Sequence, residues 1–177
     1  MRTASNIALA ILAALLIGRY FYLKPRYGRG DVAPDIAATL WNGDSFRLSG
    51  LRGNYVLLEF WGSWCGPCRD KNAGLSRLHE KYRGYRFAEA QGFEIVSVAI
   101  EPDEGRWKQA IRQDRLRWKY HLLDTTVSRK FFDGPLARQY KIVRLPTSYL
   151  LDERGLVGGV DLPVEEVDRW LAERVRE

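Results

Sequence analysis

Two cysteines are the residues of this chain whose type and spacing could do chemistry. They lie in the run Trp64-Cys65-Gly66-Pro67-Cys68, and the 177 residues contain no other cysteine. A Cys-x-x-Cys pair can close on itself as a disulfide. Thiol–disulfide exchange passes through a mixed disulfide, which a second thiol must then resolve. We therefore expect Cys65 to attack a disulfide and Cys68 to release the product.

The segments around the pair predict a strand that turns into a helix. Residues 55–61 form a short apolar run typical of a buried strand. Residues 68–79 have the pattern of an amphipathic helix. The amide groups and dipole of a helix N-terminus favour negative charge, and cysteine pKa values there fall from about 8.5 to roughly 3.5–7.5. We expect Cys65 to be the thiolate, with Arg69 and Lys71 adding positive charge near it.

Two other uses of the cysteine pair fit less well. A structural zinc site needs four ligands, and only His79 and His121 could complete it. A purely structural disulfide over this spacing would close too small a loop to stabilise the fold much. We expect both histidines to be surface or helix residues without a catalytic role.

Glu59 lies inside the predicted strand, on the same face as Leu57 and Trp61. A carboxylate in an apolar strand is unfavourable unless it is paired or protonated, and burial raises its pKa. A raised pKa would suit Glu59 to accept a proton from Cys68. The alternative is a strand-end glutamate that extends to solvent.

The N-terminal segment predicts a membrane anchor. Residues 7–18 are uncharged and apolar, and Tyr20 to Leu23 continue the segment beyond Arg19. Spanning a bilayer takes about 20 residues, which residues 4–23 supply if Arg19 reaches the headgroups. A cleaved signal peptide would need small residues after the apolar stretch. The segment could also be a buried helix of a soluble protein.

The charges around the predicted anchor favour a cytoplasmic domain. Lys24, Arg26 and Arg29 follow the apolar segment, whereas only Arg2 and the amino terminus precede it. Positive charge tends to remain on the cytoplasmic side. The formal net charge of +6 is spread along the chain, without the grouping of cations and aromatic residues typical of nucleic-acid binding.

The remaining pattern predicts one α/β domain over residues 35–177, joined to the anchor (1–23) by a linker (24–34). Strands that first alternate with helices, before a final hairpin and helix, predict a mixed sheet with helices on both faces. Residues 83–92 are interpreted as a surface loop, and residues 124–134 as a polar connector. The turn signal Asn42-Gly43-Asp44 predicts that strands 38–41 and 45–48 form an N-terminal β-hairpin extension ahead of the main fold. The other predicted strands are 56–61, 93–100, 120–123, 147–151 and 156–160, and the predicted helices are 68–82, 105–114, 136–140 and 164–175.

The cysteine run resembles the thioredoxin superfamily, and most of all the membrane-anchored thiol-disulfide oxidoreductases of the TlpA/ResA type. Residues 30–35 with 48–53 are similar to the lead-in of that family, and residues 144–152 to its cis-proline strand. The resemblance implies a thioredoxin-like fold and reduction of disulfides in exported proteins. It implies a catalytic domain on the periplasmic or outer side of the membrane, electrons from a redox partner in the membrane, and no cofactor beyond the Cys65–Cys68 disulfide.

The resemblance also implies roles for residues around the dithiol. Pro146 would be cis and face the cysteines, leaving the backbone of Leu145 to bind an extended substrate. Gly66-Pro67 is the thioredoxin dipeptide, which favours a reducing pair with a potential near about −270 mV. Trp64 would shield the thiol and contact clients. Glu59 would be the counterpart of the buried aspartate of thioredoxins.

Two departures from the family put a role in cytochrome c assembly in doubt. Lys71 stands where the assembly reductases commonly have glutamate, and Ala73 where thioredoxins have proline. A peroxidase of the peroxiredoxin class would have Thr and Pro in place of Gly62 and Leu58. A net disulfide oxidase or isomerase, and a redox-inert binding module that keeps the fold, are also compatible with the resemblance.

Overall fold

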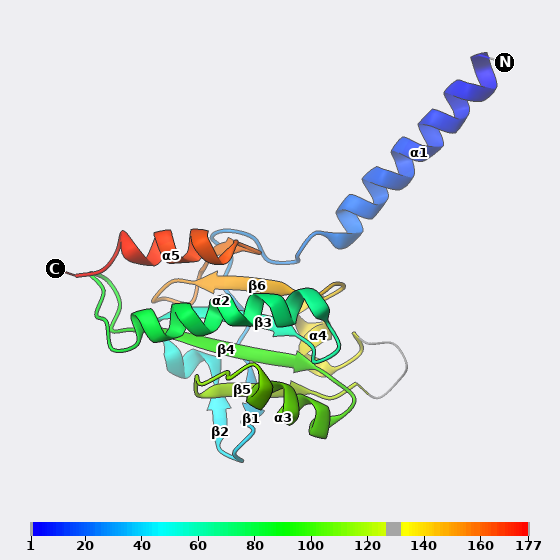
Figure 1. Ribbon diagram of the computed structural model, residues 1–177. Coiled ribbons are helices and arrows are strands. Elements are labelled where there is room, and N and C mark those ends of the chain that lie inside the picture. Colours follow the sequence, from blue (N-terminus) through cyan, green and yellow to red (C-terminus); the bar gives the residue numbers. More distant parts are fainter. Residues whose placement is uncertain (1, 127–131, 177) are drawn as a thin grey trace.

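A mixed β-sheet with helices against both faces forms the body of the chain (Figure 1). The computed structural model describes residues 2–126 and 132–176, so part of the predicted 124–134 connector lies outside the described residues. The helices are α1 (Arg2–Leu23), η1 (Leu48–Leu51), α2 (Gly66–Tyr82), α3 (Glu104–Gln113), α4 (Pro135–Tyr140) and α5 (Val164–Ala172). The strands are β1 (Ala37–Thr39), β2 (Ser45–Arg47), β3 (Tyr55–Trp61), β4 (Phe93–Ile100), β5 (Tyr120–Asp124), β6 (Thr147–Leu151) and β7 (Val157–Val160).

The sheet confirms the predicted mixture of strand directions. Its order is β5-β4-β3-β6-β7. Strands β3, β4 and β5 are parallel, whereas β6 and β7 run antiparallel to their neighbours. Parallel neighbours require a crossover, which α2 and α3 provide. Strand β3 comes first in the chain among these five strands. It lies in the middle of the sheet and is buried along its whole length.

Two apolar clusters, one on each face of the sheet, form the core. The first joins side chains of α2, α3 and α5 to one face, and includes both cysteines. The second joins α4, η1 and the β1–β2 hairpin to the other face. Since Leu57 and Trp61 belong to the first cluster and Leu58 and Phe60 to the second, Glu59 lies on the α2 face, as the alternation predicts.

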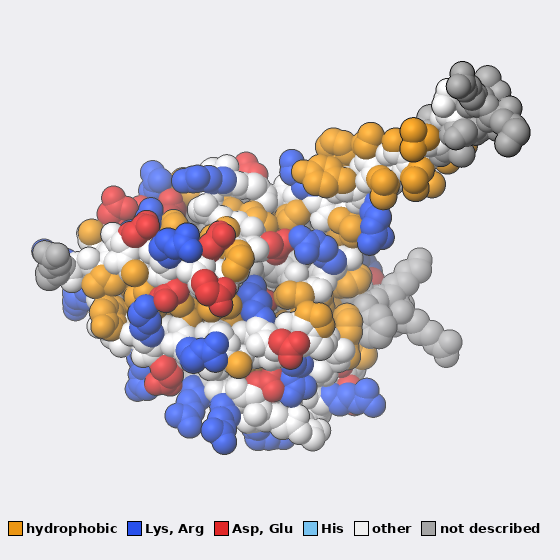
Figure 2. Space-filling view, turned by 45° about the horizontal axis from the view of Figure 1, so that its top comes forward, with side chains coloured by type: hydrophobic (Ala, Val, Ile, Leu, Met, Phe, Trp, Pro, Cys, Tyr) orange, Lys and Arg blue, Asp and Glu red, His pale blue; other side chains and the backbone are white. Residues whose placement is uncertain are grey.

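Helix α1 extends away from the domain (Figure 1), and apolar side chains are exposed along it (Figure 2). Leu9, Leu15 and Phe21 are each about two-thirds exposed, at 67%, 65% and 66%. None of the helices in the described part of the chain combines the length and apolarity needed to cross a membrane. The anchor predicted over residues 4–23 is thus helical but not confirmed as a span. Its uninterrupted apolar stretch runs only from Ile7 to Gly18.

The second half of the segment predicted as a linker, residues 24–34, is hydrogen-bonded to the sheet. The amide of Gly30 donates to the Val157 carbonyl at 2.8 Å, and the Val157 amide donates to the carbonyl of Asp31 at 2.8 Å. The ring of Tyr27 packs edge-on against Tyr140 and Tyr149. An edge strand offers unpaired backbone groups, and this segment pairs with those of Val157 at the start of β7.

The predicted surface loop 83–92 also contributes to the core. Phe87 and Ala90 are buried, and the Phe87 ring contacts Tyr55. Phe87 also forms an isolated bridge with Val175. The loop therefore closes the end of the sheet opposite the cysteines, which lie at the other end of β3.

Candidate active site

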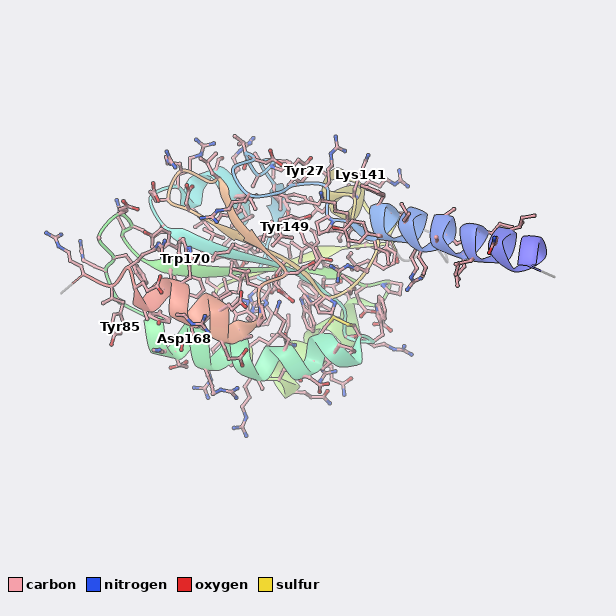
Figure 3. The ribbon with its side chains drawn as sticks, turned by 90° about the horizontal axis from the view of Figure 1, so that it is seen from above. Tyr27, Tyr85, Lys141, Tyr149, Asp168 and Trp170 are labelled. Atoms are coloured by element: carbon pink, nitrogen blue, oxygen red, sulfur yellow. A yellow bond between two sulfur atoms is a disulfide. The ribbon has the colours of Figure 1, made fainter. Side chains whose placement is uncertain are left out.

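Cys65 and Cys68 form a disulfide at the N-terminal end of α2 (Figure 3). Cys65 is the N-cap residue, and its Sγ accepts the amide of Cys68 at 3.3 Å. Pro67 occupies the first turn, where its missing N–H costs no hydrogen bond. Cys65 is 6% exposed and Cys68 is 1% exposed. The more exposed sulfur is thus the one predicted to attack.

Trp64 stands beside the disulfide with 44% of its surface exposed. Its indole N–H donates to the Ile100 carbonyl at 3.0 Å, which fixes the ring over the end of β4. A Cβ atom at Gly62 would lie 2.8 Å from Trp64 Nε1. The glycine is therefore what allows the indole to pack so closely onto the loop before the cysteines.

Glu59 is buried and paired, so the alternative of a carboxylate that extends to solvent is wrong. Its Oε2 accepts from Lys71 Nζ at 2.8 Å, and only 2% of its side chain is exposed. Lys71 also donates to Ser148 Oγ at 3.0 Å, and the β3–β6 register sets Glu59 opposite Ser148. Burial raises the pKa of Glu59 to about 7 although Lys71 opposes the rise.

Arg69 and Lys71, which were predicted to add positive charge near Cys65, are each paired with a carboxylate. Lys71 pairs with Glu59, and the Arg69 guanidinium holds Asp114 with two nitrogens, at 2.5 and 2.6 Å. Asp114 lies 45 positions further along the chain, at the C-cap of α3. No sequence pattern near Asp114 indicates that it pairs with Arg69.

A second carboxylate that sequence reasoning missed fixes the loop before the cysteines. Glu101, buried just after β4, accepts the backbone amide of Ser63 at 3.1 Å and also its hydroxyl. The available signal was a glutamate directly after an apolar strand, followed by Pro102. The bonds from Ser63 to Glu101 and the bond from Trp64 to the Ile100 carbonyl together attach the loop to the end of β4.

The bond between Leu145 and Pro146 is cis, as predicted. The register Phe60 opposite Thr147 sets Pro146 level with the end of β3, where the chain turns into the cysteine loop. The Arg144 side chain pairs with Asp161 next to this bond. Leu145 packs against both core clusters.

His121 is a buried strand residue, which corrects its predicted surface or helix position. It lies on β5 with no exposed surface, stacks on Trp118, and its Nδ1 bonds to Ser97 Oγ at 2.7 Å. Burial lowers its pKa to about 4. His79 lies on α2, half-buried, as a helix residue. The described residues include no group of three side chains that could hold a metal ion.

Comparisons with known proteins agree with this geometry. The AhpC/TSA family model matches residues 29–160. The thiol-disulfide oxidoreductase ResA of Geobacillus kaustophilus is 30% identical over 177 residues, covering 97% of this chain and 92% of its own. A solved thiol-disulfide oxidoreductase from Bacteroides fragilis is 30% identical at a TM-score of 0.68, covering 81% of this chain and 98% of its own.

A second solved structure extends the likeness. The thioredoxin domain of a thiol-disulfide oxidoreductase from Bacteroides vulgatus is 26% identical at a TM-score of 0.67, covering 81% of this chain and 97% of its own. The family match over residues 29–160 includes the cysteine run, the strand that carries Glu59 and the β6–β7 hairpin. The chain therefore belongs to the AhpC/TSA family, as a thioredoxin-like thiol-disulfide oxidoreductase close to the ResA type.

Proposed function

We propose that this enzyme reduces disulfides in exported proteins through its Cys65–Cys68 dithiol. The supporting observation is the position of the pair, with Cys65 at the N-cap of α2 and Cys68 buried behind it. The Cys65 thiolate attacks a client disulfide and forms a mixed disulfide, while one client sulfur leaves as a thiolate. Cys68 then attacks Cys65 Sγ, which releases the second client sulfur and leaves the enzyme disulfide. A dithiol partner must return the two electrons.

Glu59 serves this cycle as the acceptor of the Cys68 proton. Its carboxyl lies under the first turns of α2, because its partner Lys71 comes three residues after Cys68. A pKa of about 7 lets the group both accept and release a proton near neutral pH. Stopped-flow measurement of a model mixed disulfide should show that Glu59→Gln slows release more than attack. Equal rates for both proteins across pH 5–9 would leave Glu59 a structural residue.

The docking surface for clients consists of Trp64, Gly66 and Pro67 on one side and Leu145-Pro146 on the other. Trp64 supplies exposed aromatic surface beside the disulfide. The segment before β6 supplies backbone groups that an extended client segment can pair with. This arrangement suits unfolded or loosely folded clients better than small thiols.

Residues 4–23 attach the domain to the cell membrane, on its periplasmic or outer side, where a membrane reductant supplies electrons. Exposed apolar side chains on α1 support attachment, and the family likeness supports the outer side. The cations Lys24, Arg26 and Arg29 argue for the opposite side. A phosphatase or fluorescent reporter fused after Glu177 reports the side directly. A cytoplasmic signal, or a full chain that stays soluble after cell lysis, would refute this part of the proposal.

Insulin reduction by the full chain in neutral detergent tests the activity. We expect wild-type protein to reduce insulin, Cys65→Ser to be inactive, and Cys68→Ser to accumulate client mixed disulfides on Cys65. A potential measured in glutathione buffers distinguishes a reductase from a net oxidase or isomerase. Peroxide consumption that exceeds insulin reduction, or equal activity of wild type and Cys65→Ser, would overturn the proposal.

A further inference from the structure

A polar network ties the first turns of α2 to the end of α3. Asp114 accepts two bonds from the Arg69 guanidinium and a third, at 2.7 Å, from the side-chain amide of Asn72. The side chains of Arg69 and Asp114 are 29% and 14% exposed, and Asn72 is buried. A pair with this much burial is screened less by salt and solvent than an exposed one.

This network touches the backbone of the cysteine loop. The backbone amide of Arg69 donates to the Cys65 carbonyl at 3.1 Å. The guanidinium donates to the Ser63 carbonyl at 3.3 Å, two residues before Cys65. Arg69 is therefore a positive charge placed on the same turn as the attacking sulfur, with its position fixed by Asp114.

The other charged side chains near the dithiol also have hydrogen-bond partners. On the sheet side, Lys71 is paired with Glu59. At the end of β4, Glu101 is bound by the amide and hydroxyl of Ser63. On the α3 side, Asp114 at the C-cap of that helix is paired with Arg69. Among the described residues, this is the ion pair that includes the residue directly after Cys68.

We propose that Asp114 is a positioning residue that cancels the charge of Arg69 beside the dithiol and so holds the Cys65–Cys68 pair at a reducing potential. Reduction of the disulfide takes up two electrons and one proton, and yields a Cys65 thiolate and a Cys68 thiol. An uncompensated guanidinium next to that thiolate would stabilise the reduced form. A stabilised reduced form makes a dithiol a stronger oxidant, so compensation by Asp114 favours a reductase.

Two variants, each of which removes one charge of the Arg69–Asp114 pair, test this proposal. The measurements use the reduced full chain in neutral detergent. Asp114→Asn keeps the shape of the side chain and removes the negative charge. We expect it to lower the pKa of Cys65 and raise the reduction potential. Arg69→Gln leaves Asp114 uncompensated and should do the reverse. Each variant should change the alkylation rate of Cys65 below its pKa by about three- to tenfold, and the double variant should return close to wild type.

Two controls separate charge from structure. Asn72→Ala removes a bond to Asp114 without changing any charge, and should leave both pKa and potential unchanged. Asp168→Asn frees Lys81 from a more exposed pair at the far end of α2. That pair lies about 24 Å along the helix from Cys65, so the variant should also change neither.

The test is decided by the direction in which the Cys65 pKa and the reduction potential change in Asp114→Asn and in Arg69→Gln. The readouts are the pH profile of Cys65 alkylation and the equilibrium with glutathione buffers. Shifts of the same sign in Asp114→Asn and Arg69→Gln, or no shift in either, would overturn the inference. If Asp114→Asn does not fold, the other two variants still test the proposal, because Arg69→Gln should raise the pKa of Cys65 and lower the reduction potential, whereas the double variant should match wild type. The inference rests on the dithiol chemistry proposed above, which fails separately if wild-type protein does not reduce insulin.

Discussion

Glu59 and Lys71 show how a buried charge is kept in this fold. Moving a carboxylate out of water costs several kcal/mol, and a cation at hydrogen-bond distance returns only part of that cost. The raised pKa of Glu59 means that burial outweighs the attraction of Lys71. The folded protein therefore holds a proton on Glu59 at pH values where the unfolded chain has lost it.

The contribution of Glu59 to the stability of the protein should consequently fall as the pH rises. The Glu59 pKa is raised from 4.5 to about 7, so its contribution is fully present below 4.5 and is lost as the pH passes through 7. The loss is roughly 3 kcal/mol. Urea unfolding of Glu59→Gln should show no such loss, so the variant should be more stable than wild type at pH 8 and similar at pH 5.

Lys71→Met is the matched variant for that experiment. It removes the cation that opposes the rise in the Glu59 pKa, so we expect a larger fall in stability between pH 5 and pH 8 than in wild type. Parallel pH curves for wild type, Glu59→Gln and Lys71→Met would contradict the buried pair.

His121 should destabilise the protein at the acid end of the range. Burial lowers its pKa from 6.5 to about 4. The unfolded chain therefore takes up a proton below 6.5 that the folded protein takes up only near 4, and stability is lost as the pH falls through this window. Urea unfolding of His121→Gln should lack this fall, apart from a constant offset at pH 7–8. A slope equal to that of wild type between pH 6.5 and 4 would contradict the prediction.

At the scale of elements, sequence reasoning located most helices and strands because periodicity is local. The strands 93–100 and 147–151 were predicted with their observed bounds, because both are short segments rich in the aliphatic, aromatic and β-branched residues that favour strands. The helix predicted from Cys68 begins at Gly66, since proline fits the first turn.

The partners of the site residues were not predictable in the same way. Asp114 is 45 positions from Arg69, and Glu101 is 38 from Ser63. Such contacts depend on how α3 and β4 pack, and a polar residue in a loop gives no periodic signal of its partner. The dithiol and the face of the sheet on which Glu59 lies could be predicted from the sequence. The residues that pair with the charged side chains around the dithiol could not.

The loop between β3 and α2 should be sensitive to a single methyl group. A Cβ at position 62 would lie 2.8 Å from Trp64 Nε1 and 3.3 Å from the Ile100 carbonyl. Gly62→Ala should therefore displace the indole, change its fluorescence and lower insulin reduction several-fold, with a smaller effect on a low-molecular-weight disulfide. Gly50→Ala is the control, because a Cβ there meets nothing within 4 Å. Identical fluorescence in wild type and Gly62→Ala would mean that the ring is not held as described.

At the scale of the whole molecule, the point of truncation should matter. Deleting residues 1–23 removes α1 and leaves Tyr27 on its aromatic partners. Deleting residues 1–29 also removes Tyr27, and aromatic pairs of this kind contribute about 0.5–1.5 kcal/mol each. We expect both proteins to fold and reduce insulin, with the shorter one less stable to urea. Loss of folding in the 24–177 protein would show that α1 belongs to the catalytic fold.

With residues 4–23 held in the membrane, as proposed above, the attachment of residues 27–33 to the sheet would limit how far the catalytic domain can travel. Only Lys24, Pro25 and Arg26 separate the end of α1 from the ring of Tyr27, and three extended residues reach about 10 Å. A domain on so short a tether explores a small volume around the end of its helix. Reductant and client must therefore both approach the dithiol within that volume, and exchange between them depends on their arrival rather than on the movement of the enzyme.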